Sequence, residues 1–146
     1  MSSSGFKNML KMSSGGESAK AAAPVTPAKL DECPADVETL GRHTWTFLHT
    51  AAAYYPEKPS QAHQSSMLGL LKSLPTLYPC GHCADALKTE MKSHPPEPAI
   101  QNRGTLSQWM CDIHNEVNGR LGKEIFDCSK TDERWRTGWK DGSCDL

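Results

Sequence analysis

Two cysteines in the segment "LYPCGHC" have a spacing that could do chemistry. Cys80 and Cys83 stand two residues apart, directly after Pro79 and at the start of a helix-forming run. Two thiolates at this spacing can bind zinc, and two thiols can form a redox-active disulfide. The spacing is also compatible with no special role. The surrounding residues must therefore decide between a zinc site, a redox-active disulfide and no special role.

A redox role accounts for the position of Cys80 at the N-terminus of a predicted helix. The free backbone N–H groups and the positive end of the helix dipole favour a thiolate there. Cys83 follows one turn later, within disulfide reach. We expect Cys80 to face solvent and substrate and Cys83 to face inward, so that the outer sulfur exchanges with a substrate and the inner one passes electrons on.

A zinc site is the alternative use of the same cysteines. Cys80, Cys83, Cys111 and His114 follow a C-x₂-C…C-x₂-H pattern, which supplies four ligands. Cys111 and His114, however, fall inside a long predicted helix, whereas structural zinc cysteines usually occupy tight loops. The zinc interpretation also leaves Cys128 without a role.

A polar stripe on the same predicted helix indicates a binding pocket. It consists of Cys111, His114, Asn115 and Asn118, which follow one another at helical spacing. A first helix carries a comparable face, made of Arg42, Trp45 and His49. Together they could line a pocket for a planar ligand with polar edges, with Trp stacking on its ring and His and Asn forming hydrogen bonds. A solvated surface is the simpler alternative for each single residue.

Helical patterns account for nearly all of the chain after the first 31 residues. The spacing of apolar residues predicts helices over 36–55, 60–74 and 80–93, the first ended by Pro56 and the second by Pro75. A fourth helix follows a capping box of Thr105 and Gln108 and ends at Gly122, and a short fifth runs over about 130–138. Strand patterns are nearly absent, so we predict an all-α fold: a four-helix bundle plus a short fifth helix.

Composition narrows the class of protein further. The chain has 146 residues, a net charge of -1 and six cysteines, an unusual number for its length that indicates disulfides, metal or thiol chemistry. We expect no nucleic-acid partner from this charge, and no membrane span, because no apolar run approaches about 20 residues. Residues 1–31 are rich in Ser, Gly, Ala and Pro and are expected to be disordered; residues 32–146 are expected to form one domain.

Four separated segments carry a resemblance to a known family. "LGRHTWTFLHTAAAYYP", "YPCGHC", "WMCDIHNEVNGRLGK" and "FDCSKTDERWRTGWKDGSCD" closely resemble the FAD-linked sulfhydryl oxidases of the Erv/ALR family. The resemblance implies a helical bundle that holds FAD, with Cys80 and Cys83 as the catalytic disulfide beside the flavin. Substrate thiolate would attack Cys80, and Cys83 would communicate with the flavin. The flavin contacts implied for this chain are Arg42, Trp45, His49, Tyr54, Cys111, His114, Asn115, Asn118, Leu121, Lys123, Phe126, Arg134 and Trp135.

The same resemblance implies partners for the other four cysteines. Cys111 and Cys128 would form a structural disulfide that joins the fifth helix to the fourth. Cys33 and Cys144 would link two subunits into a covalent homodimer. All six cysteines are then paired.

The resemblance also implies the reaction and its setting. Thiol substrates, either small dithiols or the import oxidoreductase of the mitochondrial intermembrane space, would be oxidised, and oxygen or cytochrome c would accept the electrons. The expected location is the intermembrane space, with the cytosol as alternative. Longer family members carry a second CxxC in an N-terminal arm, and residues 1–32 contain no cysteine. A zinc-stabilised interaction module and a non-catalytic disulfide-linked signalling dimer are the alternative classes.

Overall fold

A computed structural model describes residues 32–145, and the expected disorder of residues 1–31 falls outside them. The chain divides into residues 1–34 and 35–146, and the account below concerns the second unit. Its regular structure is helical throughout the described residues, as predicted. The elements in chain order are α2 (Val37–Ala53), α3 (Gln61–Leu77), α4 (Gly81–Ser93), η1 (Ala99–Gln101), α5 (Arg103–Arg120), η2 (Cys128–Lys130) and η3 (Glu133–Thr137).

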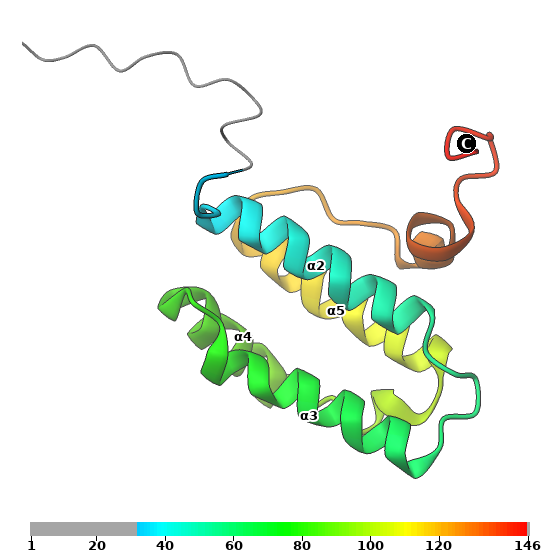
Figure 1. Ribbon diagram of the computed structural model, residues 1–146, viewed down its shortest axis with the longest axis horizontal. Coiled ribbons are helices and arrows are strands. Elements are labelled where there is room, and N and C mark those ends of the chain that lie inside the picture. The colour runs from blue at the N-terminus through cyan, green and yellow to red at the C-terminus, as the bar shows by residue number, and fades with distance from the viewer. Residues whose placement is uncertain (1–31, 146) are drawn as a thin grey trace, which may run out of the picture. The chain divides into compact units, whose positions relative to one another are not determined.

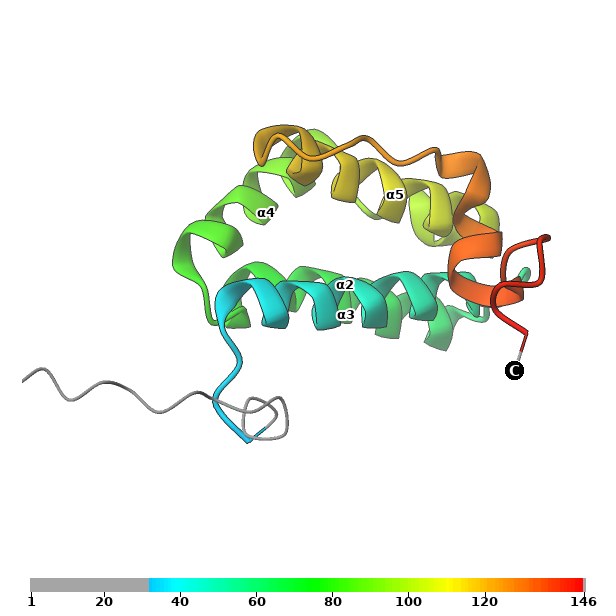
Figure 2. The same ribbon diagram turned by 90° about the horizontal axis from the view of Figure 1, so that it is seen from above.

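The four long helices form two packed pairs. α2 and α5 lie side by side and run in opposite directions, while α3 packs against α4 (Figure 1). After α5 the chain runs back along that helix in extended form, with η2 against α5 and η3 beside α2 (Figure 2). Among the described residues, no helix is long and apolar enough to cross a bilayer.

Local capping fixes where the helices begin. Asp36 caps α2 by accepting a hydrogen bond of 2.7 Å from the Thr39 backbone N–H. The predicted capping box of Thr105 and Gln108 is wrong. Asn102 is the N-cap of α5, and its side-chain oxygen accepts from the Thr105 N–H at 2.9 Å. Asn is among the strongest N-cap residues, so the helix begins three residues earlier than the Thr-x-x-Gln pattern indicates.

The predicted end of the second helix and the predicted fifth helix also differ from the structure. α3 continues through Pro75 to Leu77, because a proline in the last turn removes only one backbone hydrogen bond. Gly122 lies just past the end of α5 with a φ of 66°, as expected for a residue that closes a helix. The predicted fifth helix is instead a 3₁₀ turn, η2, followed by a single π-helical turn, η3.

The core lies between α2, α3, η1 and α5. Its fully buried side chains include Leu71, Leu106, Met110 and Ile113. Tyr55 is also buried and donates its hydroxyl to the Ile100 backbone oxygen at 3.1 Å, and burial raises the pKa of this hydroxyl. On α3 only Leu71 is fully buried, and the other large apolar side chains that face the core are partly exposed: Met67, Leu68, Leu70 and Leu74.

One buried charge joins α4 to α5. The Glu90 carboxylate is buried and forms an ion pair with Arg120, and the His94 ring lies 3.8 Å from its other oxygen. A buried charge is stabilising only while its partner is present. The pair therefore fixes the end of α4 against α5.

Replacing Arg120 by Ala is expected to lower the free energy of unfolding by about 3 kcal/mol, because the buried Glu90 carboxylate loses its partner. Urea denaturation measures this change. Glu38→Ala is the matched control, since Glu38 pairs with Arg42 on the exposed surface of α2 and such pairs contribute at most about 1 kcal/mol. Equal effects of the two changes would show that the buried pair does not stabilise the bundle.

Candidate active site

The Cys80 and Cys83 sulfur atoms are bonded to each other, 2.04 Å apart, at the start of α4. Cys80 is the N-cap of α4 and Cys83 lies in its first turn. The disulfide therefore stands at the positive end of the α4 dipole, as the sequence indicates. Either sulfur, if released as a thiolate, would be stabilised by this position.

The expected orientation of the two cysteines is wrong. Cys80 is only 6% exposed, whereas Cys83 is half-buried. The prediction treated Cys80 as the first residue of a helix, but it is the N-cap and has an extended backbone with φ of -143°. The side-chain direction of an N-cap does not follow the helical spacing, so the first sulfur is the more enclosed of the two.

His82 lies against the disulfide, and sequence reasoning did not single it out. Its two ring nitrogens are each 3.6 Å from Cys80 Sγ, and its Nε2 is 3.5 Å from Cys83 Sγ. The signal was present in the sequence, because a titratable ring stands between the two cysteines in "CGHC". The imidazole is exposed to solvent.

A cluster of four rings joins α2, α5 and η3. Trp45 stacks on His114 with ring centroids 4.0 Å apart and planes within 3°, and His49 stacks on Trp135 at 4.6 Å and 6°. His49 Nε2 and His114 Nδ1 are 2.8 Å apart and share a hydrogen bond. Four of the predicted pocket residues therefore meet in one place, although they lie up to 90 positions apart in the sequence (Trp45 to Trp135).

Both histidines of the cluster are neutral near pH 7. Burial, with smaller contributions from His114 and Arg134, lowers the pKa of His49 from 6.5 to about 3. Burial, together with Lys123, lowers the pKa of His114 from 6.5 to about 4. The positive charge at this site therefore comes from Lys123 and Arg134, and the Arg134 guanidinium lies 4.1 Å above the Trp135 ring.

The segment after α5 is fixed to that helix by a disulfide and by one amide. Cys111 and Cys128 are joined at 2.08 Å, which closes a 17-residue separation and contributes about 3 kcal/mol on the chain-entropy model. The Asn115 side chain accepts from the Phe126 N–H and donates to the Phe126 oxygen, both at 2.9 Å. Asn118 donates to Asn115 at 3.3 Å. Four of the predicted flavin contacts thus position the returning segment: Cys111, Asn115, Asn118 and Phe126.

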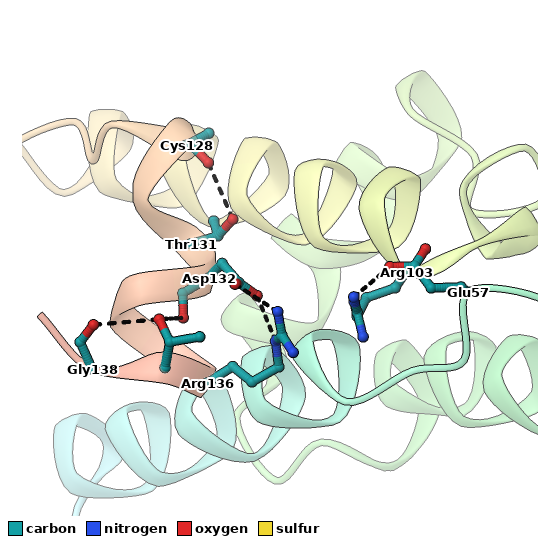
Figure 3. A network of polar contacts seen from close by, with 8 residues as sticks. Glu57, Arg103, Cys128, Thr131, Asp132, Arg136 and Gly138 are labelled. Carbon is teal, nitrogen blue, oxygen red and sulfur yellow. Dashed lines mark hydrogen bonds and ion pairs between the residues drawn. The ribbon is translucent and has the colours of Figure 1, made fainter. Parts of the chain in front are cut away.

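η3 is held in place by its own polar network (Figure 3). Asp132 accepts two hydrogen bonds from the Arg136 guanidinium, at 2.6 and 2.7 Å. These bonds lower the pKa of Asp132, with nearby Arg103 adding to the effect. The Thr137 hydroxyl lies 3.3 Å from the backbone oxygens of Asp132 and Gly138. This network holds the turn that presents Arg134 and Trp135 to the cluster.

Three predicted contact residues have other surroundings. Arg42 pairs with Glu38 at 2.9 Å on the exposed face of α2. Tyr54 and Leu121 are 66% and 63% exposed, at the C-terminal ends of α2 and α5. In the described part of the chain these three residues make no ring contact with the aromatic cluster.

The segment that leads to the disulfide approaches α2, the helix that carries Trp45 and His49. The Tyr78 hydroxyl, two residues before Cys80, approaches α2 so closely that a Cβ added at Gly41 would lie 3.9 Å from it. Gly41 is one turn from Trp45 on the same helix. α2 therefore connects the redox segment to the aromatic cluster.

The four-ligand zinc set of the sequence is not assembled. Cys80 and Cys83 are bonded to each other and Cys111 is bonded to Cys128, so none of these three sulfurs is a thiolate. His114 directs its Nδ1 toward His49 and its ring toward Trp45. The C-x₂-C…C-x₂-H spacing was misleading because the third cysteine pairs with Cys128.

The two histidines make the fold sensitive to acid. Their folded-state pKa values lie below 6.5, so as the pH falls the unfolded chain binds more protons than the folded chain does. The free energy of unfolding is therefore expected to be highest above about pH 6.5 and to fall between about pH 6.5 and pH 4. His114→Gln should make this fall shallower, because one of the two protonation sites is gone.

Urea denaturation at about pH 7.5 and about pH 5 measures that difference. His43→Gln is the matched control, since His43 is exposed on α2 and should keep the pH dependence of the original chain. The same pH dependence in all three proteins would contradict a role for the buried pair.

Comparison with known proteins agrees with this arrangement. The model of the Erv1/Alr family matches residues 42–136. "FAD-linked sulfhydryl oxidase ERV1" of Arabidopsis thaliana is 45% identical over 114 residues, which are 77% of this chain and 59% of that protein. "Mitochondrial FAD-linked sulfhydryl oxidase ERV1" of Saccharomyces cerevisiae is 40% identical over 106 residues, or 73% of this chain and 55% of that protein.

A solved structure shares the fold as well. The FAD-binding domain of Erv1 from Saccharomyces cerevisiae superposes with a TM-score of 0.69 at 38% identity, over 73% of this chain and 100% of that one. The helical bundle of this chain is therefore the fold of that FAD-binding domain. The chain belongs to the Erv1/Alr family. It spans between half and three fifths of the length of the curated relatives.

Proposed function

We propose that this chain is a FAD-dependent sulfhydryl oxidase, which makes disulfides in thiol substrates. The observation that carries the proposal is the Cys80–Cys83 disulfide at the N-terminus of α4, on a segment that contacts the helix bearing Trp45 and His49. A disulfide in that position can accept electrons from a thiol and pass them to a neighbouring aromatic cofactor. The names of the relatives support the same reaction.

The residues of the ring cluster fit FAD in their chemistry. Trp45, His114 and Trp135 offer planar faces for stacking on flat rings, and the neutral histidines can form hydrogen bonds with ring edges. Lys123 and Arg134 supply positive charge suited to the two phosphates. The neighbouring imidazoles of His49 and His114 are neutral, so the positive charge available to the phosphates is that of Lys123 and Arg134. FAD, when bound, supplies an acceptor for the electron pair of the reduced cysteines.

The protein's own part of the reaction is thiol–disulfide exchange. A substrate thiolate attacks one sulfur of the Cys80–Cys83 pair, a mixed disulfide forms, and the other sulfur leaves as a thiolate. The second substrate thiol then resolves the mixed disulfide, so that the substrate is oxidised and the pair is reduced by two electrons. The family resemblance assigns the attack to Cys80; the greater exposure of Cys83 in this structure does not favour that assignment.

The setting of the reaction belongs to the same proposal. Small dithiols, or an import oxidoreductase of the mitochondrial intermembrane space, are the thiol substrates, and oxygen or cytochrome c is the final acceptor. Two relatives, from Saccharomyces cerevisiae and Schizosaccharomyces pombe, are named mitochondrial, which supports a mitochondrial location. Residues 32–146 would form the oxidase domain, since the family model falls within them.

The purified chain should show the visible absorption of an oxidised flavin. Adding a dithiol without oxygen should bleach that absorption, and air should restore it. Cys83→Ala should keep the colour but bleach at least about a thousandfold more slowly, because the redox pair is broken while the ring cluster is intact. Stopped-flow absorption measures both rates.

Ser143→Ala, far from the redox pair in the sequence, is the control and should bleach at the original rate. A colourless protein that binds zinc would overturn the oxidase proposal and restore the zinc-stabilised interaction module. A colourless protein without zinc would leave the non-catalytic signalling dimer.

We further propose that two chains form a homodimer through disulfides between Cys33 of one chain and Cys144 of the other. Both residues are exposed. Cys144 is also held in place, because it packs against Gly138, whose φ is 81° and where an added Cβ would lie 3.0 Å from the Cys144 Cβ. Two-fold symmetry would give two such bridges.

The purified chain is therefore expected to run as a covalent dimer on a denaturing gel without reductant and as a single chain with it. Cys144→Ser should abolish the covalent dimer, because each bridge needs this sulfur. Cys83→Ala is the matched control, since it removes a different cysteine and should leave the bridges in place. A covalent dimer that survives in Cys144→Ser would refute the pairing.

A further inference from the structure

The His82 imidazole is the side chain that touches the reactive disulfide on both sulfurs. Its Nδ1 and Nε2 each lie 3.6 Å from Cys80 Sγ, and its Nε2 lies 3.5 Å from Cys83 Sγ. The two equal distances place Cys80 Sγ beside the ring, so a small rotation of the imidazole can turn either nitrogen toward it. Since His82 is exposed, it can exchange protons with solvent while it remains in contact with the sulfurs.

Opening this disulfide creates negative charge next to that ring. When a thiolate attacks one sulfur, the S–S bond breaks and its electron pair leaves on the other sulfur. A thiolate is stabilised by a nearby imidazolium and by a helix N-terminus. An imidazole and a helix N-terminus are both next to these sulfurs, because Cys80 caps α4 and Cys83 and His82 lie in its first turn.

We propose that His82 is a catalytic residue of the exchange reaction. Its imidazole stabilises the departing sulfur as a thiolate and can then transfer a proton to it. The inference rests on the proposed thiol oxidase function. In the reducing step, the imidazolium donates its N–H to the sulfur that leaves and becomes neutral if the proton is transferred. In the return step, the neutral ring takes the proton back, so that the cysteine is again a thiolate when its electrons pass on.

Contact with both sulfurs has a mechanistic consequence. One ring can serve whichever cysteine the substrate attacks, since the other always lies within 3.6 Å of a ring nitrogen. His82 therefore assists the reaction even though Cys80 is the more buried sulfur. Stabilising the reduced form also makes the pair a stronger oxidant of substrate thiols.

The equilibrium between the pair and glutathione tests this role directly. The full-length protein is equilibrated without oxygen in glutathione redox buffers, its thiols are trapped by alkylation, and the peptide with Cys80 and Cys83 is quantified by mass spectrometry. His82→Ala is expected to lower the equilibrium constant for reduction about tenfold, which corresponds to about 30 mV. The rate at which dithiothreitol opens the disulfide should fall by about the same factor.

Two variants separate the proposed role from simple packing. His82→Lys keeps a cation beside the sulfurs and should restore the equilibrium constant to within about threefold of the original. His43→Ala removes an exposed imidazole from α2 and should change nothing. The Cys111–Cys128 disulfide, followed in the same samples, should be equally resistant to reduction in every variant and so reports that the fold is intact.

The proposal is overturned if His82→Ala leaves both the equilibrium constant and the opening rate within about twofold of the original, or if the Lys variant is affected as strongly as the Ala variant. Neither readout requires bound flavin or an electron acceptor. A chain that lacks oxidase activity but shows the His82 effect would therefore refute the proposed function alone. An active oxidase with an unchanged disulfide equilibrium would refute the role of His82 alone.

Discussion

The packing of α2 against α5 through aromatic and imidazole rings is the interaction on which the site depends. Trp45 and His49 from α2 meet His114 from α5 at stacking and hydrogen-bonding distances. Enclosing these rings keeps both histidines neutral, because burial penalises the charged imidazolium. The same contact holds α2 against α5, so the candidate binding site adjoins the core.

The rest of the C-terminal region completes this surface by being folded back onto it. The Cys111–Cys128 disulfide and the Asn115–Phe126 amide contacts fix the extended segment along α5. η3 then presents Trp135 to His49. A short turn of this kind has too few buried side chains to be stable alone. Its position therefore depends on the Cys111–Cys128 disulfide and on its own Asp132–Arg136 pair.

Two kinds of chemistry are thus built on different elements of the bundle, the ring cluster on α2, α5 and η3 and the disulfide on α4. The ring cluster offers neutral planar groups with flanking cations, which suits a flat anionic cofactor. The disulfide at the start of α4 offers a reducible bond with an imidazole and a helix dipole beside it. α2 connects them, because Tyr78 approaches Gly41 one turn away from Trp45.

The sequence by itself determined the helical class, most helix positions and the cysteines that matter, because apolar spacing, prolines and the CxxC pattern are local signals. The contacts between distant segments placed the rest: the enclosure of Cys80, the use of Asn115 as a backbone anchor and the stacking of Trp135 on His49. Each of these depends on the direction of a side chain outside regular helical spacing, or on contacts between distant segments. No pattern within a single helix specifies them.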